Sequence, residues 1–221
     1  MAPGNAVRAD PSLLSHGRRL TMPYILWPLL SLGVFLPLTK LLQKKRPRLS
    51  AVCKMLATLC AAALALSGGP SEGGWLCVAA LLLCAAADGL LCVHFVAGMA
   101  VFAAGHVAYM AWFLTRQGLT WLSTVIFPLL LVLGFGLLWH WRDRLGKLAL
   151  PMCAYAVILS AMGALGIPCG GLAALAACLF VLSDIMVCRQ VVMPVSLAFD
   201  VSALGIYYAA QLLFGAACAL L

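Results

Sequence analysis

Apolar residues follow one another along this chain in runs long enough to cross a lipid bilayer, and short polar segments separate the runs. A hydrocarbon core about 30 Å thick needs about 20 apolar residues in a helix, which satisfies its own backbone groups. The pattern therefore predicts an all-α polytopic membrane helical bundle with about eight transmembrane helices. The expected spans are 23–42, 51–68, 75–92, 94–114, 119–140, 148–166, 170–188 and 194–220.

The polar breaks are short and consist mainly of basic, glycine and proline residues, as in 44–48 and 166–171. Such breaks mark turns, and none is long enough for a soluble domain, so we expect residues 23–221 to form a single transmembrane domain. Residues 1–22 lack apolar periodicity and are expected to form a loose polar tail. The span that follows is too long, and lacks a clear small-residue cleavage site, for a removed signal peptide.

The amino-acid composition is typical of a membrane protein, and the distribution of charge indicates which classes of partner it can bind. Of the 221 residues, 65% are hydrophobic and 9% are charged, and the mean hydropathy is +1.10. No water-soluble domain exposes such a surface. The formal net charge is +8, but the cations follow the loop edges and are not grouped in a polar domain with stacking aromatics. We therefore expect membrane lipids as partners, and no nucleic acid.

The positions of the cations predict an orientation in the membrane. If the spans are correct, one side carries the tail and the connections after the second, fourth and sixth spans, with Arg8, Arg18, Arg19 and Arg116. The opposite side carries Lys40, Lys44, Lys45, Arg46, Arg48, Lys54, Arg142, Arg144, Lys147 and Arg189. The positive-inside rule makes the more basic side cytosolic, so both termini face away from the cytosol.

The ten cysteines lie almost entirely in or at the ends of the spans, and no Cys-x-x-Cys pair occurs. Small apolar packing is the expected use. Four scattered histidines do not complete a zinc site, and we expect neither metal nor cofactor. Cysteine-rich helices favour the endoplasmic reticulum membrane, or a bacterial inner membrane if the chain is prokaryotic. A homodimer is left open.

Two acids, Asp88 and Asp184, lie well inside apolar spans. A charged carboxylate near the bilayer centre costs about 2.5 kcal/mol or more, so each is expected to face the bundle interior and to serve a purpose. Each lies about 13 residues, or about 20 Å, from the start of its span, and the two spans run in the same direction. If spans 75–92 and 170–188 are neighbours, the acids form the floor of one pocket that opens toward the cytosolic side, and if they are not neighbours, no shared pocket is expected. The alternative is a structural pair, such as Asp88 with Lys54.

Other polar residues occur in the same spans. His106 and Tyr109 share a helix face, and Tyr207 and Gln211 lie on one stripe with Asp200. Each also has an ordinary structural explanation, such as a hydrogen bond between helices, a snorkelling lysine or a hydroxyl bonded to its own helix. The candidate substrate-binding residues are Lys54, His106, Tyr109, Tyr155, Ser183, Tyr207, Tyr208 and Gln211.

Four segments together resemble the lysoplasmalogenase (YhhN-like) family: Asp88 to Leu91 (DGLL), Phe95 to Tyr109 (FVAGMAVFAAGHVAY), Leu179 to Asp184 (LFVLSD) and Tyr207 to Leu213 (YYAAQLL). The segments occur in the family's order and are spread over most of the chain. Any one of them is a weak signal, whereas the ordered set is fairly specific.

Lys54 and Tyr155 also stand where that family has a lysine and a tyrosine. Two neighbours depart from the family pattern, because Ala87 replaces a common Gly and Met55 replaces a common Pro. The resemblance implies an eight-helix membrane hydrolase in which Asp88 and Asp184 are the essential acids. It implies cleavage of the vinyl ether bond of lysoplasmalogens to a fatty aldehyde and glycerophosphoethanolamine or glycerophosphocholine.

Two carboxyl groups suit that chemistry. Hydrolysis of a vinyl ether begins with protonation of the β-carbon, and water then captures the oxocarbenium ion. A protonated acid and an ionised one therefore divide the work, as two acids do at a glycosidic bond. As a hypothesis, Asp184, in the more apolar surroundings, is the proton donor and Asp88 is the base. The alternatives are a proton-coupled membrane transporter and a non-catalytic lipid-binding bundle.

Overall fold

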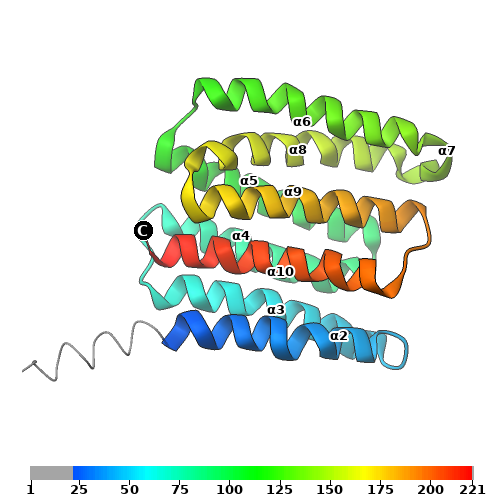
Figure 1. Cartoon of the computed structure of the whole chain (residues 1–221), viewed down its shortest axis with the longest axis horizontal. Helices are drawn as coiled ribbons and strands as arrows, with labels where there is room; N and C mark the ends of the chain where they lie inside the picture. Colours follow the sequence, from blue (N-terminus) through cyan, green and yellow to red (C-terminus); the bar gives the residue numbers. More distant parts are fainter. Residues whose placement is uncertain (1–21, 221) are drawn as a thin grey trace, which may run out of the picture.

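The computed structural model describes residues 22–220. Within this part of the chain, eight helices are long and apolar enough to cross a membrane, and no strand is present. This confirms the predicted all-α polytopic bundle, and the protein is an integral membrane protein (Figure 1). The predicted tail lies outside the described residues, except that the first helix already includes Met22.

The first spanning helix is Met22–Gln43, and it includes a π-helical segment between Pro28 and Pro37. Proline has no backbone N–H to donate, so the regular hydrogen-bond ladder is interrupted at both positions. The elements are η1 (Leu29–Phe35), α2 (Leu36–Gln43), α3 (Pro47–Ser67), α4 (Gly74–Leu91), α5 (Phe95–Gln117), α6 (Trp121–His140), α7 (Arg142–Leu145), η2 (Gly146–Leu148), α8 (Ala149–Gly166), η3 (Ile167–Cys169), α9 (Gly171–Val192) and α10 (Leu197–Ala219).

Capping residues in the connections determine where several helices begin. The side chain of Thr120 accepts a hydrogen bond from the backbone N–H of Ser123, and Ser196 does the same for Phe199. Such caps satisfy donors that a helix leaves free at its first turn. Gly170 precedes α9 with φ +71, a conformation that glycine adopts without strain. The short predicted connection between the third and fourth spans is present, because only residues 92–94 separate α4 from α5.

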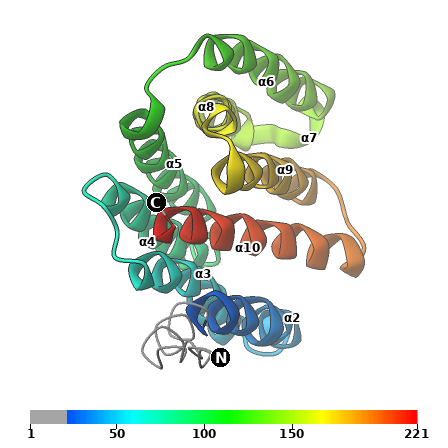
Figure 2. The same ribbon diagram turned by 60° about the vertical axis from the view of Figure 1, so that its left-hand side comes forward.

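Six helices form a closed ring. In order around the ring they are α3, α4, α5, α8, α9 and α10, and each packs against the next, with α10 returning to α3. Helix α10 also reaches α4, and it runs through the middle of the molecule in both ribbon views (Figure 2). The last span thus closes the ring, and side chains that point inward from all six helices share one interior.

The other two spans lie outside this ring. The first helix packs on α3, and α6 packs on α8. Only 11% of the most apolar window of each outer helix is buried, compared with 56% for α3 and for α10. Leu129 and Val132 on α6 are largely exposed. Apolar side chains at such positions suit contact with lipid tails.

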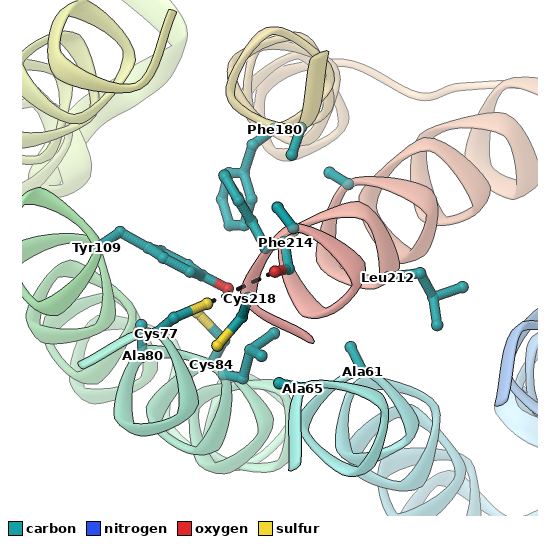
Figure 3. Close-up of a cluster of buried hydrophobic side chains, with 14 of the residues drawn as sticks. Ala61, Ala65, Cys77, Ala80, Cys84, Tyr109, Phe180, Leu212, Phe214 and Cys218 are labelled. Atoms are coloured by element: carbon teal, nitrogen blue, oxygen red, sulfur yellow. Dashed lines mark hydrogen bonds between the residues drawn. The ribbon is translucent and has the colours of Figure 1, made fainter. Parts of the chain in front are cut away.

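Side chains fill the ring interior at the end where the chain terminates. Tyr109, Phe180 and Phe214 meet there from α5, α9 and α10, as Figure 3 shows. Cys77 and Cys218 are buried in the same cluster, and Cys77 donates a weak hydrogen bond to the carbonyl oxygen of Phe214. These cysteines therefore pack as small apolar residues, as the sequence indicates.

Candidate active site

The opposite half of the ring is hollow. A cavity of about 350 Å³ lies there, lined by residues of α2 to α6 and α8 to α10, and both Asp88 and Asp184 face it. Its lining residues come from the late turns of α4 and α9 and the early turns of α3, α5 and α10. The cavity is therefore near the end of the bundle that carries the connections after α2, α4, α6 and α9. We call this the cation-rich end, because the ten basic residues named above lie toward it.

The condition that the sequence sets for a shared pocket, direct packing of the two acid-bearing spans, is not met, and the conclusion drawn from it, that the pocket would then be absent, is wrong. Helices α4 and α9 are opposite members of the ring, separated by α5 and α8 on one side and by α3 and α10 on the other. The shared pocket nevertheless exists, because Asp88 and Asp184 point inward from opposite walls. The equal depth of the two acids is therefore sufficient, and direct packing of their helices is not required.

Two hydroxyl groups hold the side chain of Asp88, which is buried with 6% of the residue exposed. Thr58 of α3 donates to its Oδ2 at 2.5 Å, and Tyr207 of α10 donates to the same oxygen at 3.0 Å. Lys54, one turn before Thr58, lines the cavity but forms no ion pair with a carboxylate of residues 22–220. The structural pair of Asp88 with Lys54 is thus not formed.

A chain of hydrogen bonds continues from Asp88 into the packed half of the ring. The amide nitrogen of Gln211 donates to the Tyr207 hydroxyl at 3.0 Å. The hydroxyl of Tyr109 donates to the amide oxygen of Gln211 at 2.6 Å. Each group in this chain donates or accepts according to its chemistry, so the network is satisfied and holds one orientation of the carboxyl group.

The side chain of Asp184 has different partners. Tyr155 of α8 donates from its hydroxyl to Oδ2 of Asp184 at 2.5 Å, and Nε2 of His106 lies 3.6 Å from the same oxygen. The tyrosine hydroxyl is also 3.3 Å from Nε2 of His106. His106 is fully buried, and its ring contacts Phe180 edge-on. Three titratable groups from three helices thus form one cluster.

The hydrogen bonds of this cluster link His106 to Asp184 through one hydroxyl group. The carbonyl oxygen of Phe102 can only accept, so Nδ1 of His106, 2.8 Å away, carries a proton. Nε2 of the same ring faces the hydroxyl of Tyr155, which donates to Asp184. Tyr155 therefore connects the imidazole to the carboxyl group, and the three side chains hold one another in position.

The predicted site residues fall into three groups. Besides the two acids, Lys54, Tyr155 and Tyr207 line the cavity. His106, Tyr109 and Gln211 do not line it but are hydrogen-bonded to residues that do, or to one another. Ser183 donates to the carbonyl of Phe180 on its own helix, and the buried hydroxyl of Tyr208 has no hydrogen-bond partner among the described residues.

Sequence analysis did not predict four polar residues as part of the site: Lys40, Gln190 and Asp200 line the cavity, and Thr58 donates to Asp88. Thr58 is four residues after Lys54, so the two lie on one helix face, and this spacing could have identified it. The sequence identifies Lys40 only as one of the cations on the predicted cytosolic side. Its Nζ forms an ion pair with Oδ1 of Asp200 at 2.7 Å, a contact between the first and last spans that no local pattern indicates.

The rest of the cavity wall is mainly apolar. Met99 of α5, Leu137 and Leu138 of α6, and Met152 of α8 line it, and Figure 1 shows α6 and α8 on the far side of the bundle from α2. Gly134 of α6 also lines the cavity, and a side chain there would approach Ala156 on α8. The cavity thus has a charged part, two carboxyl groups, and an apolar part, which is the arrangement that an amphiphile requires.

Fold and site together define the protein as a polytopic integral membrane protein that presents two carboxyl groups to one intramembrane cavity. The sequence model of the YhhN family matches residues 49–218, which include seven of the eight spans in whole or in large part. The chain belongs to the YhhN family, the family of lysoplasmalogenases. No curated protein matches the chain, and no solved structure matches it.

Proposed function

We propose that the protein is a lysoplasmalogenase, which hydrolyses the vinyl ether bond of a lysoplasmalogen to a fatty aldehyde and the glycerophospho-headgroup. The observation that carries the proposal is that Asp88 and Asp184 line the same cavity from opposite walls. Membership of the YhhN family supports it independently. The bond to be cleaved lies at the junction of the polar and apolar parts of the lipid, and the cavity that contains the two acids has both charged and apolar lining residues.

The first step is proton transfer to carbon. Protonated Asp184 gives its proton to the β-carbon of the vinyl ether, and the electron pair of the double bond forms the new C–H bond. The resulting oxocarbenium ion carries its positive charge on the ether oxygen and the α-carbon. The carboxylate that remains on Asp184 stabilises this cation across the cavity, where little water screens the charges.

The second step is addition of water, followed by collapse. Asp88 takes a proton from a water molecule as the water oxygen bonds to the α-carbon, and a neutral hemiacetal forms. Asp88 then returns its proton to the ether oxygen, while Asp184 takes the proton of the hemiacetal hydroxyl. The C–O bond breaks, the aldehyde and the glycerol hydroxyl are released, and both acids regain their starting states.

The groups around the acids give each of them a separate task. Thr58 and Tyr207 both donate to Oδ2 of Asp88, which suits a carboxylate that must remain ready to accept a proton. Tyr155 and His106 hold the side chain of Asp184 in the cavity wall, where it can reach the β-carbon of the substrate. Tyr109 and Gln211 act through Tyr207 and are therefore positioning residues.

A direct assay tests the reaction. Purified protein in detergent is incubated with a lysoplasmalogen and, separately, with the saturated ether lysolipid of the same headgroup and chain length. We expect fatty aldehyde from the first substrate only, because the saturated ether has no double bond to protonate. If the vinyl ether lipid yields no aldehyde, the proposed activity is rejected, and solute uptake into sealed vesicles would favour a transporter instead.

The membrane in which the protein works stays a prediction. The cysteine content of the helices favours the endoplasmic reticulum membrane, with the cation-rich end in the cytosol. Fractionation of the full chain with organelle markers tests the compartment. Protease protection of a tag on either terminus tests the orientation, because both termini are expected to be shielded from the cytosol.

A further inference from the structure

The charged part of the cavity contains three side chains that the proposed reaction does not use. Lys40 of α2, Lys54 of α3 and Asp200 of α10 all line it. Lys40 and Asp200 are paired at 2.7 Å, with 10% and 25% of their side chains exposed. An ion pair that is mostly removed from water costs desolvation energy that its own attraction does not reliably repay. A role in binding a charged ligand accounts for its presence in the wall of the cavity.

The charges match a particular kind of ligand. Two lysines and one carboxylate leave one net positive charge, which suits a phosphodiester, and the carboxylate provides a separate place for a cation. The ion pair uses Oδ1 of Asp200, so Oδ2 is the oxygen left for a ligand. Such a site complements a zwitterionic headgroup in which a phosphodiester is followed by an amine.

We propose that Lys40, Lys54 and Asp200 form the headgroup site of the cavity and that Asp200 selects a primary ammonium, as in glycerophosphoethanolamine. The lysines bind the phosphodiester, and Asp200 accepts a hydrogen bond from the ammonium group. A primary ammonium has three N–H donors, whereas a trimethylammonium has none, so the carboxylate favours ethanolamine over choline. This inference rests on the proposed function and specifies its substrate.

The distances along α10 support this assignment. Asp200 is seven residues before Tyr207, so the helix rises about 10 Å between them. The hydroxyl of Tyr207 contacts Asp88. In a lysoplasmalogen, nine bonds separate the ammonium nitrogen from the vinyl ether oxygen, which spans on the order of 11 Å when extended. An ammonium at Asp200 therefore allows the vinyl ether to reach the level of the two acids.

Substrates that differ only in the headgroup provide the kinetic test. Aldehyde release is measured from lysoplasmalogens that carry ethanolamine, choline or an amine-free phosphoglycerol group. We expect the unchanged protein to favour ethanolamine over choline about tenfold in kcat/KM, the size expected for one charge-assisted hydrogen bond. Asp200→Asn should remove this preference through KM, with little change in kcat, and should leave the phosphoglycerol lipid unaffected.

Two further variants separate headgroup binding from a purely structural role. Lys54→Met should raise KM for all three lipids by a similar factor, because each contains the phosphodiester. Arg189→Gln is the matched control, since Arg189 is near Asp200 and stacks on Phe199 but does not line the cavity. It should change neither KM nor the headgroup ratio. If Asp200→Asn lowers activity on all three lipids equally, Asp200 only anchors Lys40, and the proposal is wrong.

A binding measurement distinguishes failure of this inference from failure of the proposed function. Saturated ether lysolipids with ethanolamine, choline or phosphoglycerol headgroups are titrated into the unchanged protein and into Asp200→Asn. Tighter binding of the ethanolamine lipid, lost in the variant, supports the headgroup site even if no lipid is cleaved. Equal binding of the ethanolamine and choline lipids by the unchanged protein overturns it, even if the vinyl ether lipid is hydrolysed.

Discussion

The two halves of the ring interior have the same helices but opposite properties, and α10 passes through both. In the packed half, its residues Leu212 and Phe214 are buried in the cluster of Figure 3. In the hollow half, Asp200, Leu204 and Tyr207 of the same helix line the cavity. Ring closure alone therefore does not create the cavity. The side chains decide which half is filled.

Small residues close the packed half. A Cβ atom on Gly215 of α10 would collide with the backbone of Ala61 on α3, so the two helices touch there. Similarly, Gly105 of α5 lies against Cys84 of α4. Such close approach favours helix packing in membranes, where dispersion forces and hydrogen bonds replace the hydrophobic effect. Rigid packing at one end can then support polar groups at the other, through the chain from Tyr109 to Asp88.

Removal of one carboxyl group should have the largest effect, and it should affect catalysis in the hollow half without affecting the stability that the packed half provides. Asp88→Asn and Asp184→Asn should each lower kcat about 10²- to 10⁴-fold, because each removes a group that transfers a proton. Thermal unfolding in detergent should change little, since the packed half is untouched. The matched control is Asp143→Asn, whose side chain is 85% exposed and outside the cavity. Near-normal hydrolysis by either intramembrane variant would remove the catalytic role of that acid.

Substitution of two leucines on α10, one in each half, compares how much each half contributes to the free energy of unfolding. Leu212→Ala should reduce the free energy of unfolding by about 2–5 kcal/mol, because it leaves a void in tightly packed surroundings. Leu204→Ala should cost about 1 kcal/mol, because one side of Leu204 already faces the cavity. The measurement is the midpoint of thermal unfolding in one detergent. Equal losses would show that the two halves are equally packed.

The hydrogen-bonded cluster around Asp184 should contribute less to kcat than the acid itself, because Tyr155 and His106 position the acid and do not react. Tyr155→Phe removes the hydroxyl between Asp184 and His106, and we expect kcat to fall about ten- to a hundredfold, with KM nearly constant. Tyr208→Phe is the control, because that buried hydroxyl has no partner in the described part of the chain. A fall in kcat for both variants would indicate a general effect of lost tyrosine hydroxyls.

Much of the fold could be predicted from the sequence, because a bilayer restricts a spanning segment to a continuous apolar helix. The short connection at 92–94 and the inward acids follow from the same pattern. The ring order could not be predicted, since it depends on which small residues meet between distant helices, as Gly215 meets Ala61. For this reason the sequence leaves open whether the two acid-bearing spans are neighbours, and the structure places them on opposite sides of the ring.

The site could be predicted in part, because the same apolar spans make buried polar residues conspicuous. Asp88, Asp184 and Tyr155 are polar residues within apolar spans, and a burial argument identifies them. The division between cavity walls and supporting residues could not be predicted. Tyr207 and Tyr208 are adjacent in the sequence, but one bonds to Asp88 and the other has no partner among the residues described. Which of two neighbouring side chains faces the cavity depends on the rotation of α10, and the helices packed against it, α2, α3, α4 and α9, set that rotation.

The smallest effect on activity is expected from substitutions in the apolar part of the cavity. Two glycines of α6 allow a matched comparison. Gly134 of α6 lines the cavity, whereas Gly136 is exposed and a Cβ there would meet nothing within 4 Å. Gly134→Leu should fill space that a fatty chain needs, so we expect kcat/KM for a long-chain lysoplasmalogen to fall about tenfold relative to a short-chain one. Gly136→Leu should leave this ratio unchanged, because its side chain faces away. If the two variants behave alike, the fatty chain does not lie against α6 and must occupy another wall of the cavity.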